Sequence, residues 1–155
     1  MNSRADFATV RFKEGFNCAQ AVFSAYAPLL GIEEDDALRI STGFGAGMGR
    51  QQEVCGAVTG ACMVIGSRHG MSDAKDTAAK EITYAMVKDF TRRFCQLHNS
   101  ISCRALLGCD INTEEGRKDY NERKLSVTVC LPCVQNACRI VEEIAFQEDD
   151  SRPHS

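Results

Sequence analysis

The sequence predicts an all-α protein, a single-domain compact bundle of roughly five to seven helices. Apolar residues recur at the 3.6-residue period of an α-helix along most of the chain, whereas the strict alternation of a β-strand is hard to find. Proline, which interrupts helices, is limited to three residues in 155. This length corresponds to one domain, which we place at residues 1–146, followed by a polar tail at 147–155.

In the first half of the chain, glycines and polar caps mark where helices begin and end. Asn17 is a preferred N-cap, and Gly31 can adopt the left-handed conformation that often follows a helix. The acidic run at 33–36 suits a helix start, because carboxylates stabilise the positive end of the helix dipole. Residues 43–49 are too rich in glycine for a regular element and predict a loop. The helices expected here cover 5–13 and 17–31, and two more begin at 33 and 55.

The second half of the chain contains the longest predicted helix, over residues 73–99, and a final amphipathic helix with an apolar face from Val134 to Ala145. Ser102 and Thr113 are N-cap candidates for two short helices between them. The apolar stripe of the longest helix is Ile82, Met86, Phe90, Phe94 and Leu97. Each apolar face should pack on a shared core.

The charge balance argues against binding to nucleic acid or to an anionic membrane. The chain has 18 basic and 21 acidic residues, a formal net charge of −3, so it presents no basic field. The first residues lack the apolar segment of a secretory signal, and the longest apolar run, 54–66, is too short to span a bilayer. We therefore expect a cytoplasmic protein, in which many cysteines indicate metal binding or thiol chemistry.

Four of the nine cysteines lie at predicted helix N-termini in four separate segments: Cys18, Cys55, Cys103 and Cys130. A helix N-terminus lowers the pKa of a thiol, and the thiolate is both the nucleophile and the metal ligand. The dipole contributes only about 0.3–1 kcal/mol, whereas one pKa unit is about 1.4 kcal/mol. If the four thiols converge, the dipole alone cannot keep them all ionised. Either a metal centre neutralises them, or they pair as disulfides, or most stay protonated.

The other cysteines give weaker signals. Cys133 completes Cys130-Leu-Pro-Cys133, which has the C-x-P-C form of a redox dithiol, so it is a possible substitute for Cys130. Cys95 and His98 could offer two metal ligands on one helical face, but a lone pair at this spacing is a weak signal. The cysteines expected to fill the core as small apolar residues are Cys62, Cys95, Cys109 and Cys138.

Two glycine patterns accompany the cysteines. Gly56 and Gly60 form a G-x-x-x-G face, which lets another helix pack closely, including a helix of a homodimer partner. Their backbone should also lie near a site at Cys55 and give its sulfur room and N–H donors. The glycines at 43–49, followed by Arg50, suggest an anion-binding loop, although they match no phosphate-loop pattern.

Together these segments resemble a known family, the redox-active proteins named for the C-GCAxxG-C-C pattern, which are small domains with four shared cysteines. The central motif stands here as Cys55-Gly56-Ala57-Val58-Thr59-Gly60. The flanking matches are Gly15-Phe-Asn-Cys18-Ala-Gln-Ala-Val22, Cys103-Arg-Ala-Leu-Leu-Gly108 and a closing cysteine before Val134-Gln-Asn-Ala137. The resemblance runs from about Phe12 to Ile144 and implies a redox site made of Cys18, Cys55, Cys103 and Cys130. The domain is also similar to the cysteine-bearing part of split-Soret-type cytochromes, which implies that an iron–sulfur centre can be associated with it.

The leading hypothesis is a redox protein that uses this four-cysteine site. It would perform dithiol/disulfide exchange, with Cys55 as the attacking thiolate, or electron transfer through a [2Fe–2S] cluster bound by all four cysteines. Its partner would be a redox protein or a small thiol, and such a role is favoured over an enzyme with its own organic substrate. The alternatives are a structural or interaction module whose cysteines bind zinc or fill the core, and a nucleotide or anion binder that uses residues 43–49.

Overall fold

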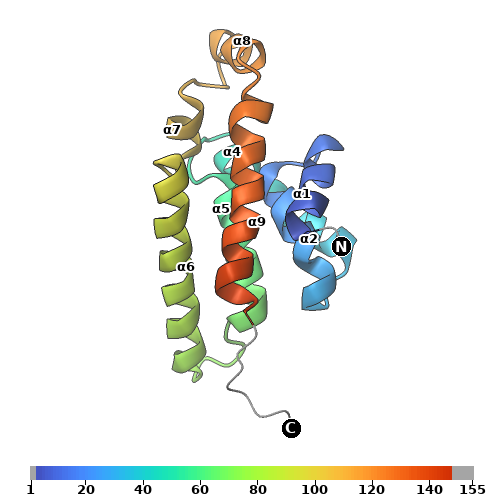
Figure 1. The fold of residues 1–155 in the computed structure, drawn as a ribbon, viewed down its shortest axis with the longest axis vertical. Helices are drawn as coiled ribbons and strands as arrows, with labels where there is room; N and C mark the ends of the chain where they lie inside the picture. The colour runs from blue at the N-terminus through green and yellow to red at the C-terminus, as the bar shows by residue number, and fades with distance from the viewer. Residues whose placement is uncertain (1–2, 148–155) are drawn as a thin grey trace.

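The computed structural model describes residues 3–147 and shows an all-α protein, which confirms the predicted fold class. The helices are α1 (Arg4–Lys13), α2 (Cys18–Leu30), α3 (Glu34–Ser41), α4 (Gly45–Met48), α5 (Gly56–His69), α6 (Thr77–His98), α7 (Cys103–Leu107), α8 (Glu114–Glu122) and α9 (Leu131–Ala145), with the single turns η1 (Thr42–Phe44) and η2 (Ser126–Cys130). Figure 1 shows α6 and α9 running side by side, with α8 at one end and α1 and α2 on the other side of α9.

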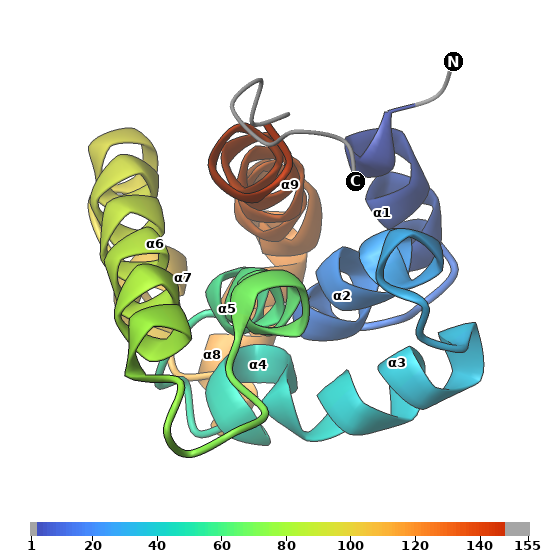
Figure 2. The same ribbon diagram turned by 90° about the horizontal axis from the view of Figure 1, so that it is seen from below.

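Helix α9 lies at the centre of the bundle. Seen along the long axis in Figure 2, α9 stands between α6 and α1, and it also packs on α5. Its inner face consists of Val134, Ala137, Cys138 and Val141, all completely buried, as the amphipathic pattern predicts. The hydroxyl of Tyr26 on α2 donates to the carbonyl oxygen of Cys138 at 2.8 Å, so α2 is tied to α9 as well.

Helices α2 and α5 pack closely through two glycines of α5. A Cβ atom on Gly60 would lie 2.9 Å from the carbonyl oxygen of Ala19 and 3.1 Å from Cβ of Val22. A Cβ atom on Gly56 would lie 3.0 Å from the backbone nitrogen of Ala19. The predicted close-packing face is therefore present, but α2 of the same chain covers it, which removes the reason for expecting a homodimer contact at these glycines.

Helix α6 differs from the sequence-based prediction in its start and in its stripe. It begins at Thr77, later than predicted. Phe90 and Phe94 are completely buried, whereas Ile82 and Leu97 are 51% and 59% exposed. Because α6 stands at the outside of the bundle, only the side facing α9 and α5 is covered (Figure 2).

A π-turn, η2, directly precedes the final helix, so the helical segment starts upstream of α9. In η2 the N–H of Leu131 donates to the carbonyl oxygen of Ser126, and α9 continues from there without a break. Cys130 has helical backbone angles, φ −63° and ψ −46°. Cys130 is the N-cap of α9, as Pro132 predicts, but η2 precedes it, so Cys130 does not stand at a free helix end. The wider turn before Pro132 accommodates a ring that would clash with the preceding turn of a regular α-helix.

The glycine-rich segment forms a compact turn in which separate stretches of backbone lie close together. Ala46 and Gly47, inside α4, have positive φ angles of 52° and 67°. A Cβ atom on Gly47 would lie 2.5 Å from the backbone nitrogen of Glu53, and one on Gly45 would collide with the side chain of Asn17. Backbone packing thus accounts for Gly47, and the Asn17 side chain accounts for Gly45.

Within residues 3–147, no helix is both long enough and apolar enough to cross a membrane. The predicted polar tail starts at Gln147, and the rest of it, 148–155, lies outside the described residues.

Candidate functional site

Five cysteines line one cavity of about 740 Å³ between α1, α2, α5, α7, α8 and the η2–α9 junction. They are the four predicted residues, Cys18, Cys55, Cys103 and Cys130, together with Cys133. All nine cysteines of the chain are free thiols in this structure. The fold thus brings distant segments to one place, and the redox role of these thiols stays a prediction.

A short antiparallel contact positions Cys55 and Cys103. Val54 and Ser102 form an isolated β-bridge. The backbone N–H of each cysteine donates to the opposite segment, both at 2.7 Å. Immediately after the bridge each segment turns into a helix, so Cys55 is the N-cap of α5 and Cys103 is the first residue of α7. One bridged residue pair is too short to produce the alternating apolar pattern of a strand, so the sequence did not predict this contact.

Cys18 is the first residue of α2, and the predicted Asn17 cap holds it in place. The Asn17 side chain accepts from a backbone N–H in the first turn of α2 and donates to the carbonyl oxygen of Thr42, both at 2.9 Å. Gly56 brings the start of α5 against this turn, since a Cβ atom there would lie 3.2 Å from Cβ of Cys18. Gly56 lines the cavity as predicted, whereas Gly60 does not and instead packs on α2.

Cys130 and Cys133 lie one turn apart at the junction of η2 and α9, and both face the cavity. Cys130 is half-buried, whereas Cys133 is 1% exposed. The cavity contains both thiols, and the assignment of either one to the redox site stays a prediction.

Four of the thiols shift one another's pKa most strongly in two pairs. Cys18 pairs with Cys130, and Cys55 pairs with Cys133. In each pair the hydrogen bond and then burial raise the pKa of one thiol, Cys18 or Cys133. The partner thiol accepts the hydrogen bond and is the one favoured as a thiolate.

Additional donors distinguish the two favoured thiols. The hydrogen bond from Cys133 lowers the pKa of Cys55 against the effect of burial, and the N–H groups of Ala57 and Val58 at the start of α5 lower it further. The hydrogen bond from Cys18 lowers the pKa of Cys130, and the hydroxyl of Tyr120, 3.9 Å from its sulfur, acts in the same direction. The N–H groups at the start of α5 therefore lower the pKa of Cys55, as the sequence predicts, whereas only side chains lower the pKa of Cys130.

Cys103, the fifth thiol, has the side chain of Gln52 as its hydrogen-bond partner. Burial, together with the neighbouring Cys55 and Cys130 sulfurs, raises the pKa of Cys103 to about 12, although Gln52 acts in the opposite direction. Gln52 is itself buried and donates to the carbonyl oxygen of Cys109 at 2.9 Å. Cys103 is therefore held as a protonated thiol next to both pairs.

A chain of hydrogen bonds behind the cavity ends at Cys133. Nδ1 of His98 lies 3.7 Å from the sulfur of Cys133, and Nε2 lies 3.1 Å from the amide nitrogen of Asn136. The Asn136 oxygen accepts from Arg139 at 3.1 Å. Because arginine can only donate, Asn136 turns its NH₂ group toward His98, which leaves the imidazole proton on Nδ1. Burial lowers the pKa of His98, so the ring is neutral and donates to Cys133.

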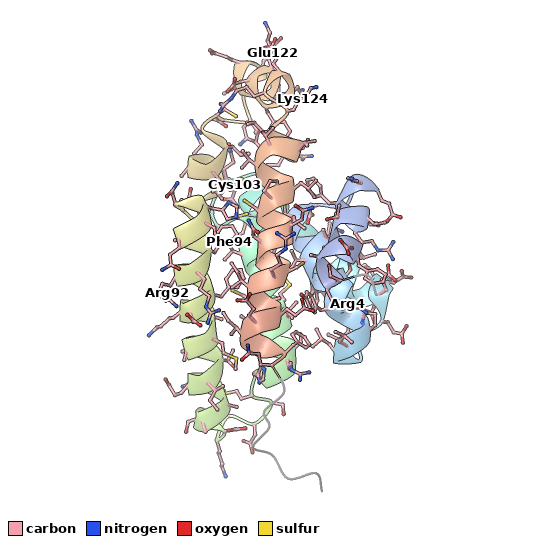
Figure 3. All side chains as sticks on the ribbon, viewed as in Figure 1. Arg4, Arg92, Phe94, Cys103, Glu122 and Lys124 are labelled. Atoms are coloured by element: carbon pink, nitrogen blue, oxygen red, sulfur yellow. The ribbon has the colours of Figure 1, made fainter. Side chains whose placement is uncertain are left out.

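Sequence reasoning considered His98 only as a metal-ligand partner of Cys95 and missed its contact with Cys133. The available signal was its position one turn after Phe94, on the buried side of α6. The two rings are 4.6 Å apart between centroids. Figure 3 shows Phe94 between α6 and α9, with Cys103 further along toward α8.

The remaining four cysteines do not line the cavity: Cys62, Cys95, Cys109 and Cys138. Burial raises the pKa of Cys62 to about 11 and that of Cys138 to about 12, so both are protonated at neutral pH. Cys109 packs in a small apolar cluster with Leu107 and Leu125. The positions of Cys62, Cys109 and Cys138 agree with the expectation that such cysteines fill space as small apolar residues. Cys95 is half-buried and belongs to neither core cluster among the described residues.

A metal centre needs several ligand side chains grouped around one point. Within residues 3–147, no three His, Cys, Asp or Glu side chains are arranged to hold one metal ion. A [2Fe–2S] cluster bound by four cysteines needs two thiolates for each iron, and the cavity offers two thiol pairs.

Comparisons with known proteins agree with the resemblance seen in the sequence. The family model described as "Putative redox-active protein (C_GCAxxG_C_C)" matches residues 16–144, a range that includes all five cavity cysteines. Neither a curated protein nor a solved structure matches the chain.

Proposed function

Because the chain belongs to the C_GCAxxG_C_C family, which supports a redox role, we propose that it carries out thiol–disulfide exchange through the pairs Cys55–Cys133 and Cys18–Cys130. The observation that carries the proposal is the convergence of five cysteines from separate segments on one cavity. Among them, each pair joins a thiol whose pKa is lowered to a neighbour whose pKa is raised. Such neighbours can close into a disulfide.

The proposed reaction starts with Cys55. Its thiolate attacks a sulfur of a substrate disulfide, which forms a mixed disulfide and releases the first substrate thiolate. Cys133 then attacks the Cys55 sulfur of the mixed disulfide, so a Cys55–Cys133 disulfide forms and the second substrate thiolate leaves. Cys133 gives up its one thiol proton, which ends on one leaving group, and the other leaving group departs as a thiolate that solvent protonates. Two electrons thus pass from the cysteine pair to the substrate, and the redox partner is a protein or small-molecule disulfide.

His98 has a defined role in the second step. Its Nδ1–H donates to the Cys133 sulfur, which favours the thiolate form of Cys133 against burial and against the neighbouring Cys55. Asn136 holds the imidazole in the tautomer that makes this donation.

A second candidate function uses the same thiols as ligands. Each pair would supply two thiolates to one iron of a [2Fe–2S] cluster, and the bound cluster would provide one-electron transfer. The observation that favours it is the two-by-two grouping around one cavity. In this case Cys133 takes the place that the sequence analysis gave to Cys103.

Protein purified without oxygen separates these candidates. The visible spectrum and the iron, sulfide and zinc contents are measured first, and disulfides are mapped by peptide mass spectrometry after oxidation. We expect colourless, metal-free protein that forms Cys55–Cys133 and Cys18–Cys130 reversibly. Cys55→Ser should abolish the first disulfide and keep the second, and the control Cys95→Ser should keep both.

Other results would contradict the exchange proposal. Brown protein with matched iron and sulfide would support the cluster. Stoichiometric zinc would support a structural site. Oxidation that yields no disulfide between the named partners would leave the cysteines as core residues.

A substitution at His98 tests the second step. His98→Phe keeps a ring against Phe94 but removes the donor, so closure of Cys55–Cys133 should slow about tenfold, the equivalent of one charge-assisted hydrogen bond. The pH profile of closure should also move to higher pH, because Cys133 loses a group that stabilises its thiolate. Rapid quenching with alkylating reagent and mass spectrometry measures both effects.

Two controls make this test specific. His69→Phe changes a histidine that contacts the carbonyl oxygen of Ala145, away from the thiols, and should leave closure unchanged. His98→Asn retains an N–H donor and should recover part of the rate. Equal rates in His98→Phe and the unmodified protein would show that His98 has only a packing role.

A further inference from the structure

The rim of the cavity carries positive charge and no negative charge. Lys13, Arg50 and Arg117 line it, from α1, from the residues after α4, and from α8. None of the aspartates or glutamates among residues 3–147 lines it. Since the whole chain has a net charge of −3, this local excess of cations is opposite in sign to the average charge of the molecule.

The three cations are not committed to ion pairs with the described acidic residues. None of them takes part in a salt bridge within residues 3–147. The nearest acidic residue in sequence to Lys13 is Glu14, which is paired with Arg11. Arg117 makes one long hydrogen bond, 3.4 Å, to the carbonyl oxygen of Ile111. The charges are therefore available to a ligand.

The walls below the rim are apolar and end at the thiols. They include Phe12, Phe16, Leu107 and Val129, and the cavity volume of about 740 Å³ falls in the range of small-molecule sites, roughly 300–1,000 Å³. Near the sulfurs, α2 and α5 present their N-termini, whose dipoles also favour negative charge. Cations at the mouth, apolar walls and thiols at the base form one continuous site.

We infer that this cavity takes small organic disulfides that carry carboxylate groups. The inference rests on the proposed exchange reaction and specifies its substrate. The carboxylates would face the rim cations, the apolar body would lie against the aromatic and aliphatic walls, and the disulfide would reach Cys55. The balance of the reaction is the one given above: the substrate disulfide is reduced to two thiols and Cys55–Cys133 is oxidised to a disulfide.

The test compares three disulfides of different charge on the fully reduced protein. 5,5′-Dithiobis(2-nitrobenzoate) is a dianion, 4,4′-dithiodipyridine is neutral and cystamine is a dication. The rate at which Cys55 loses its free thiol is measured by acid quench, alkylation and peptide mass spectrometry. Because a leaving thiol of lower pKa also speeds exchange, each rate is expressed relative to the rate of the same reagent with a small uncharged free thiol. We expect this relative rate to be at least about tenfold higher for the dianion than for the dication, because clefts of one sign raise association rates by about 10–10³. The advantage should shrink as salt is raised.

Two triple variants with the same change in total charge locate the effect. The first variant combines Lys13→Gln, Arg50→Gln and Arg117→Gln. It should slow the reaction of Cys55 with the dianion about tenfold and change the reaction with the neutral reagent less than about twofold. The control variant combines Lys75→Gln, Lys80→Gln and Lys88→Gln. These residues lie on or just before α6 and outside the cavity, so the control should change neither rate.

The possible failures are distinguishable. Equal relative rates for the dianion and the dication, or equal slowing in both triple variants, would overturn the inference and leave the exchange reaction standing, provided that the neutral reagent still oxidises Cys55 and Cys133. If none of the three disulfides oxidises Cys55, the proposed function fails and the inference fails with it.

Discussion

Replacing Gly60 by alanine is expected to destabilise the protein by about 1–3 kcal/mol, the usual cost of inserting a methyl group into a packed contact. The new Cβ atom would lie 2.9 Å from the carbonyl oxygen of Ala19, a backbone atom on the facing helix that cannot rotate away. Relief requires α2 and α5 to separate, which would also move Cys18 away from Cys55. This cost outweighs the gain of about 0.5–1 kcal/mol that alanine brings to a helix interior.

Gly66 is a matched control in the same helix. A Cβ atom there has no neighbour within 4 Å, so Gly66→Ala should stabilise the protein by about 0.5–1 kcal/mol through helix propensity alone. Urea unfolding of both variants, followed by circular dichroism, gives the two free energies. If both substitutions stabilise the protein, the close contact between α2 and α5 is not present in solution.

Replacing Gln52 by alanine is expected to cost roughly 2–6 kcal/mol, because one buried and one part-buried backbone group lose their partners at about 1–3 kcal/mol each. Gln52 is 4% exposed. Its amide nitrogen donates to the carbonyl oxygen of Cys109 at 2.9 Å, and its amide oxygen accepts from the N–H of Ile111 at 3.0 Å. These bonds hold the segment after α7 against the turn before α5, and so they also fix Cys103.

The adjacent Gln51 provides the comparison. It is exposed, and its side chain bonds only to the nearby Met48 carbonyl oxygen, so Gln51→Ala should change the free energy of unfolding by less than about 0.5 kcal/mol. Urea titration measures both variants, and alkylation of Cys103 should become faster only in Gln52→Ala. Similar free energies for the two variants would mean that water replaces the Gln52 bonds.

Local chemistry accounts for the parts of the fold that the sequence predicts well. Asn17, Ser102 and Thr113 each accept a backbone hydrogen bond at a helix start, and Gly31 ends α2 with a positive φ of 68°. A cap needs only residues within one turn, so its pattern is complete in the sequence. The same reasoning applies to Cys18 and Cys55, whose helix-start positions follow from the residues next to them.

Contacts between distant segments were not predictable in this way. The bridge between Val54 and Ser102 joins two residues that carry no strand pattern. The contact of His98 with Cys133 depends on how α6 packs against α9. Which residues of α6 are exposed depends on which helices pack against it. Four of the cavity cysteines were identified from their local positions, but their pairing is a property of the assembled bundle.

The wide turn η2 has a consequence for how the length of this chain can vary. A π-turn stores one residue more than an α-helix needs over the same stretch. Loss of one residue from Ser126–Cys130 would leave an uninterrupted α-helix, while the face of α9 kept its phase on the core. The extra residue is taken up within η2 itself, so the Tyr120 hydroxyl upstream would keep its place as well. Shortening at this point should therefore spare both the bundle and the wall of the cavity.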